Sequence, residues 1–132
     1  MRDINEIILH CSDSDVAAHD DIEVIRGWHV NERGWSDVGY HYFIQSNGNI
    51  QKGRQWGRIG AHCAGRNKHT LGICLHGRDE FTQAQFDSLE ELIERIELEL
   101  GTLMVNGHYK YSEKTCPNFD VEQFNESRWA DL

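Results

Sequence analysis

Three side chains that can bind a metal ion lie near the ends of short apolar segments, far apart in the sequence. His10 closes an apolar run and precedes a polar loop, His108 follows the run 103–105, and Cys116 lies a few residues further on. Pro117 biases Cys116 away from helical geometry, which lets the thiol point into a cleft. Two imidazoles and a thiolate could hold zinc with a fourth position open to water, which distinguishes a catalytic zinc site from a closed structural one.

The spacing of these residues alone does not decide for a metal site. The sequence contains neither H-E-x-x-H nor paired C-x-x-C motifs. A buried histidine or cysteine is more often an ordinary core residue than a ligand. A zinc ion here could also be structural, with His62 or His76 closing its coordination shell. At the level of spacing these alternatives stay open.

Composition excludes several classes of protein. The 132 residues suffice for one domain, which we expect over 1–132, and 39% hydrophobic residues with a single proline indicate a folded chain. A net charge of −9 argues against a nucleic-acid partner. No apolar run approaches the roughly 18 residues of a membrane span, and the start of the chain has no signal-peptide pattern. We therefore expect a soluble, acidic protein with no membrane partner.

Hydrophobic patterning predicts the elements that must position the candidate ligands. Thr82 and Gln85 form a capping box at the start of a helix that Gly101 ends, and Asp20 or Asp21 caps an earlier helix that ends at 33–34. A third helix is expected at 121–129. Strands are expected at 7–11, 38–45, 50–51, 70–75 and 103–105. This order predicts an α/β fold with a central mixed sheet flanked by helices, whose active site lies at strand ends.

Five stretches occur in one order along the chain: ILHCS (8–12), RGWSDVGYHY (33–42), HCAGRN (62–67), LGICL (71–75) and KTCPNFD (114–120). In this order they resemble the zinc-dependent N-acetylmuramoyl-L-alanine amidases, the family of the small phage lysozymes and the animal peptidoglycan recognition proteins. The resemblance runs from about residue 7 to about residue 129. It implies hydrolysis of the amide between the lactyl group of N-acetylmuramic acid and the L-alanine of the stem peptide in bacterial peptidoglycan.

The resemblance also implies roles for individual residues. His10, His108 and Cys116 match the ligands of one zinc ion. Tyr40 and Lys114 match positions that assist catalysis, and His62 matches a histidine beside the substrate groove.

These implied roles agree with the chemistry of amide hydrolysis. A zinc ion with an open position lowers the pKa of bound water to about 7 and polarises the scissile carbonyl. The Lys114 ammonium and the Tyr40 phenol suit stabilisation of the developing oxyanion, each by about 2–4 kcal/mol. The leaving nitrogen could take its proton from Tyr40, Lys114 or a water.

Neighbouring residues are expected to be structural. Tyr40 and His41 are adjacent on a predicted strand and would point to opposite faces, which places His41 in the other layer. By the same alternation Cys11 should point away from the ligand site into the core. Trp28 and Trp35 are interpreted as packing residues.

The resemblance favours a monomeric phage or prophage endolysin. Such an enzyme is made in the host cytoplasm and acts on the periplasmic cell wall after holin-type release. The stretch before His10 lacks much of the extension by which some phage lysozymes bind phage RNA polymerase, so that interaction is not expected. The alternative is a non-catalytic peptidoglycan-binding module of the same fold. Because such modules lose a zinc ligand, the presence of Cys116 favours the enzyme.

Overall fold

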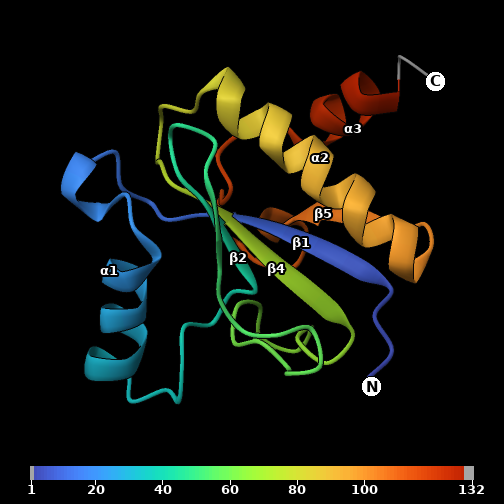
Figure 1. The fold of residues 1–132 in the computed structure, drawn as a ribbon. Helices are drawn as coiled ribbons and strands as arrows, with labels where there is room; N and C mark the ends of the chain where they lie inside the picture. The colour runs from blue at the N-terminus through green and yellow to red at the C-terminus, as the bar shows by residue number, and fades with distance from the viewer. Residues whose placement is uncertain (1, 130–132) are drawn as a thin grey trace.

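A five-stranded mixed sheet forms the centre of the computed structural model, which describes residues 2–129 (Figure 1). Its strands are β1 (Glu6–Cys11), β2 (Tyr42–Ile44), β3 (Ile50–Lys52), β4 (Thr70–Leu75) and β5 (Met104–Gly107), arranged in the order β3-β2-β4-β1-β5. β1 pairs in parallel with both β4 and β5, β4 pairs in parallel with β2, and β3 is antiparallel to β2. The predicted central mixed sheet is confirmed.

The two faces of the sheet have different coverings. On one face, α2 (Gln83–Leu100) and α3 (Val121–Trp129) enclose the main apolar core (Figure 1). The other face meets α1 (Ile22–Gly27), where Ile22 and Ile25 pack on Phe43 and Cys74. Successive residues of a strand face opposite sides, so Leu9 lies in the main core whereas His10 lies on the α1 side.

The helix boundaries follow the signals read from the sequence. The side chain of Asp21 accepts a hydrogen bond from the Glu23 N–H and caps α1. Thr82 and Gln85 form both bonds of the capping box, and Gly101, with a φ of 83°, ends α2. Beyond α1 the chain continues as a π-helical turn, η2 (Trp28–Glu32), which the sequence did not indicate. Within residues 2–129, no helix combines the length and apolarity needed to cross a membrane.

The predicted strand 38–45 is shorter in the structure, because β2 begins at Tyr42. The reason is the side chain of His41. Its Nδ1 accepts the Gly72 N–H at 3.1 Å, and this bond takes the place of a regular ladder bond between strands. The predicted strand 103–105 is shifted to Met104–Gly107, since the Leu103 N–H donates to a carboxylate oxygen of Glu97 in the last turn of α2.

One buried polar side chain joins α2 to the ends of two strands. Gln85 has no exposed surface, and its amide nitrogen donates to the carbonyl oxygens of Ile44 (3.2 Å) and His76 (2.9 Å). Its amide oxygen accepts the Thr82 N–H at 2.9 Å. Every polar group of this side chain is therefore used to hold the helix on the sheet.

We expect Gln85→Leu to lower the free energy of unfolding by about 1–3 kcal/mol, because the substitution removes all three hydrogen bonds of the side-chain amide, including the one to the His76 carbonyl oxygen. The midpoint of urea unfolding measures this loss. The control is Gln83→Leu at an exposed position of the same helix, which should change stability by less than about 0.5 kcal/mol. Equal midpoints for the two variants would contradict the assignment.

Candidate functional site

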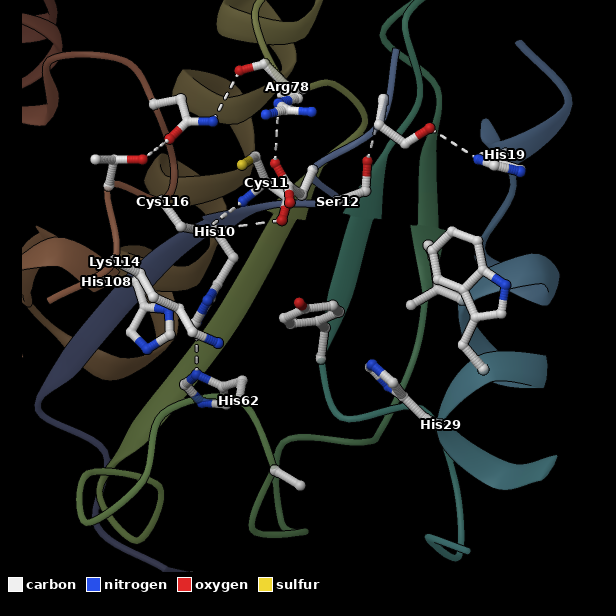
Figure 2. A pocket seen from close by; sticks show the side chains of 18 of the residues that line it. His10, Cys11, Ser12, His19, His29, His62, Arg78, His108, Lys114 and Cys116 are labelled. Carbon is white, nitrogen blue, oxygen red and sulfur yellow. Dashed lines mark hydrogen bonds and ion pairs between the residues drawn. The ribbon is translucent and has the colours of Figure 1, made fainter. Parts of the chain in front are cut away.

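The fold brings the three predicted ligands together at one end of the sheet (Figure 2). His10 lies near the end of β1, and His108 begins the 3-10 turn η3 (His108–Lys110) that follows β5. The ligand atoms of His10, His108 and Cys116 all lie within 4.8 Å of one another, and the two imidazole centroids are 4.6 Å apart. Parallel pairing of β1 with β5 is what places these residues side by side.

Backbone groups hold Cys116 in place. Its carbonyl oxygen accepts the Tyr109 N–H at 2.9 Å, and its Sγ accepts the Cys11 N–H at 3.0 Å. Cys11 is buried, but its side chain contacts that of Cys116 and lines the cleft, so the prediction that it points away from the ligand site was wrong. The sulfur is thus fixed by the end of the same strand that carries His10.

The electrostatic environment keeps the ligand imidazoles neutral. Burial lowers the pKa of His10 well below its usual value, and the neighbouring His62, His108 and Lys114 lower it further. Burial and Lys114 lower the pKa of His108. Neutral imidazole is the form that binds a metal ion, because it retains a lone pair on one ring nitrogen.

The Cys116 thiol behaves differently. Its contact with the Cys11 side chain and its burial raise the pKa of the Cys116 thiol well above its usual range. A divalent cation at the site would deprotonate the thiol outright, so that metal binding releases a proton.

His62 contacts both a ligand and the sheet beneath it. Its Nδ1 lies 2.8 Å from Nε2 of His10, and its Nε2 lies 3.2 Å from Oγ1 of Thr70. Burial lowers the pKa of His62 to about 3. The ring lies over Gly72, where a Cβ atom would come within 2.6 Å of the ring. His62 also lines the cleft.

Tyr40 and Lys114 are near the candidate metal ligands. The Tyr40 ring centroid is 5.1 Å from that of His10, and burial raises the pKa of the Tyr40 phenol well above its usual value. The phenol therefore keeps its proton and can act as a hydrogen-bond donor. Lys114 is exposed, and its side chain extends toward His10 and His62 (Figure 2).

These residues lie in a cleft of about 950 Å³. One wall comes from η2 and the segment after it, with Trp28 and Trp35; Arg78 and Asn118 also line the cleft. Trp28 packs against the smaller core around Ile22 and Phe43, as expected for a packing residue, and both tryptophans also line the cleft. Helical spacing shows which side of a helix turns inward. It does not show that a residue on the inward side, such as Trp28, also borders a cleft.

His41 is not on the opposite face from Tyr40, as strand alternation had predicted. Because β2 begins only at Tyr42, alternation does not extend to these two residues. The His41 ring is buried with its centroid 6.0 Å from that of His62. Its Nε2 donates to the Arg58 carbonyl oxygen at 2.8 Å while its Nδ1 accepts the Gly72 N–H. His76, also weighed as a ligand, is buried at the end of β4, 3.9 Å from Asp20, and is outside the three-residue group.

Comparison with known proteins agrees with this arrangement. The sequence profile of the N-acetylmuramoyl-L-alanine amidase family matches residues 1–119. The chain is 33% identical over 126 residues to the endolysin of Escherichia phage T7, covering 89% of this chain and 83% of the phage protein. It is 31% identical over 131 residues to the endolysin of Klebsiella phage KP32, covering 93% and 86% respectively. The solved endolysin N-acetylmuramoyl-L-alanine amidase LysCS from Clostridium intestinale superposes with a TM-score of 0.84 at 27% identity, covering 96% of this chain and 84% of LysCS.

The hydrogen bonds of His41 predict a dependence of stability on pH. Burial lowers the pKa of His41 to about 4, against about 6.5 in an unfolded chain. Well above pH 6.5 both states are neutral at this residue and it adds no pH dependence. Between pH 6.5 and 4 only the unfolded state binds the proton, so the free energy of unfolding falls as the pH falls.

We expect His41→Gln to make this slope shallower by about 1.4 kcal/mol per pH unit between pH 6 and 4.5, the contribution of one proton. Urea unfolding of the metal-free protein at several pH values measures it. His69→Gln, which removes an exposed imidazole, is the matched control. An unchanged slope in His41→Gln would show that His41 is not held neutral.

Proposed function

Because the chain belongs to the N-acetylmuramoyl-L-alanine amidase family, we propose that it hydrolyses the amide between N-acetylmuramic acid and L-alanine in peptidoglycan with one zinc ion held by His10, His108 and Cys116. The observation that carries this proposal is the convergence of three ligand atoms within 4.8 Å in a cleft that Tyr40 and Lys114 also line.

The donor set fits zinc. Two imidazoles and one thiolate are borderline-soft ligands, and three protein ligands with a free fourth position are typical of catalytic zinc sites. His62 does not add a fourth ligand, because its Nδ1, the ring nitrogen that faces His10, is already used in a contact with Nε2 of His10. The cleft leaves room for substrate beside the three ligands.

When bound, zinc supplies Lewis-acid polarisation of the scissile carbonyl and a nucleophile at neutral pH. The chain's own residues stabilise the charge that develops on the carbonyl oxygen. Lys114 brings a positive charge into the cleft, and Tyr40 brings a phenol that stays protonated because burial raises its pKa. Groups placed in this way lower the barrier by about 2–4 kcal/mol each.

Peptidoglycan reaches this site through the cleft rather than through long-range attraction. The net charge of −9 gives no attraction toward an anionic cell wall. A cleft of about 950 Å³ lies at the upper end of the range for ligand sites, which suits a sugar together with part of its peptide. Likeness to two phage endolysins supports a role in host lysis, with synthesis in the host cytoplasm and action on the periplasmic wall after holin-type release.

The bond that is cut can be identified by mass spectrometry of purified peptidoglycan after incubation with the protein. We expect stem peptides with a free L-alanine amino group, none of them when EDTA is present, and their return when zinc is restored. New reducing sugar ends would indicate a glycosidase and would contradict the proposal. Peptidoglycan that binds the protein but stays intact would indicate the non-catalytic binding module.

Two substitutions separate metal binding from charge stabilisation. Cys116→Ala should lose zinc and turnover together, since it removes a ligand. Lys114→Ala should keep zinc but lower kcat by about 30- to 1000-fold, as expected for loss of about 2–4 kcal/mol of transition-state stabilisation. Zinc content is measured by atomic absorption and turnover on purified peptidoglycan. Glu113→Ala, at an exposed neighbouring position, is the control, and full activity of zinc-free Cys116→Ala would refute the mechanism.

A further inference from the structure

A line of hydrogen-bonding groups runs from the candidate metal centre to the start of β4. Nε2 of His10 lies 2.8 Å from Nδ1 of His62, and Nε2 of His62 lies 3.2 Å from Oγ1 of Thr70. The Thr70 hydroxyl in turn donates to the carbonyl oxygen of Arg66 at 2.8 Å. Each contact is within hydrogen-bond distance, so the protonation of one group fixes that of the next.

The direction of these hydrogen bonds follows from the last group of the line, the Arg66 carbonyl oxygen. A carbonyl oxygen only accepts, so the single hydrogen of the Thr70 hydroxyl is used in the bond to Arg66. Oγ1 of Thr70 must then accept, and the donor is the Nε2–H of His62. In neutral His62 the other ring nitrogen, Nδ1, carries a lone pair and accepts from the Nε2–H of His10. His10 is left with its free lone pair on Nδ1.

We propose that Thr70 is a positioning residue that acts through His62 to fix His10 in the Nε2–H tautomer, so that Nδ1 of His10 is the atom presented to the metal. The proposal rests on the zinc-binding role of His10 proposed above. A neutral imidazole has two tautomers, and the Nδ1–H form would direct a hydrogen instead of a lone pair toward the metal. The hydrogen bond of the second ring nitrogen decides between them.

The surroundings of His62 support this role. Thr70 is only 3% exposed, and it is held in β4 opposite Glu6 of β1. The loop that carries His62 is fixed by the Asn67 side chain, whose Oδ1 accepts the His62 N–H at 3.0 Å. Gly72 leaves the space in which the ring lies, since a Cβ there would come within 2.6 Å of it. The imidazole can therefore neither move away nor exchange its partners easily.

Long-range 1H–15N correlation spectra of the imidazoles, recorded on metal-free protein at neutral pH, test the proposal without any assay of turnover. In the wild type we expect the Nε2–H tautomer at both His10 and His62. Thr70→Val removes the acceptor at nearly the same volume, and we expect Nδ1–H populations to appear at both histidines. Thr70→Ser keeps a hydroxyl and should restore the wild-type spectrum.

Zinc affinity gives a second readout, by competition with a chelator. We expect Thr70→Val to weaken zinc binding 10- to 100-fold, in the range of residues that orient a metal ligand. Thr70→Ser should stay within about threefold of the wild type. Thr102→Val, at an exposed turn position, is the matched control for the loss of a threonine hydroxyl.

The outcomes separate this proposal from that of amidase activity. A wild-type spectrum with Nδ1–H at His10 would overturn it even if Thr70→Val did not fold. Unchanged tautomers and zinc affinity in a folded Thr70→Val would overturn it as well. If the expected spectra and affinities were found in a protein that binds zinc but leaves peptidoglycan intact, only the proposed reaction would fail.

Discussion

The burial of β1 on both faces is the constraint on which the rest of the molecule depends. All six residues of this strand are buried, and it pairs in parallel with a neighbour on each side. A polar side chain in such a strand is tolerated only where it finds a partner. His10, 1% exposed, has one in His62 and would have a second in a metal ion. The candidate site thus lies where β1 ends, and there α1 covers one face of the sheet while α2 and α3 cover the other.

The same constraint explains the electrostatics of the cleft. Several buried or half-buried histidines lie close together near the sheet end, and loss of solvent is the main cause that lowers the pKa of each (His10, His29, His41 and His62). Neutral rings can serve as acceptors for backbone N–H groups, as His29 does for Gly39 and His41 for Gly72. A high histidine count therefore serves two purposes here, since some rings complete backbone hydrogen bonding and others belong to the candidate metal site.

Much of the architecture could be predicted from the sequence because local signals and the fold agree. The Thr82 capping box and the apolar runs at β1 and β4 correspond closely to elements of the structure. The convergence of His10, His108 and Cys116 was expected from strand ends and from family resemblance. Thr70 had no local signal, because a threonine that opens a strand resembles any other β-branched residue. The positions of Trp28 and His41 depended on how far α1 and β2 extend, which tertiary hydrogen bonds determine.

Within the part of the chain that the structure describes, β5 is an edge strand that pairs only with β1, yet two of the three candidate ligands lie on the segment that follows it. A metal ion bound there would join the edge of the sheet to its centre, next to the contact between Cys11 and Cys116, which are 105 positions apart in the sequence. Opening of this edge would then be linked to release of the metal, because an ion bound only in the closed state stabilises that state by mass action. Scarcity of the metal would loosen the C-terminal part of the chain before the remainder unfolds.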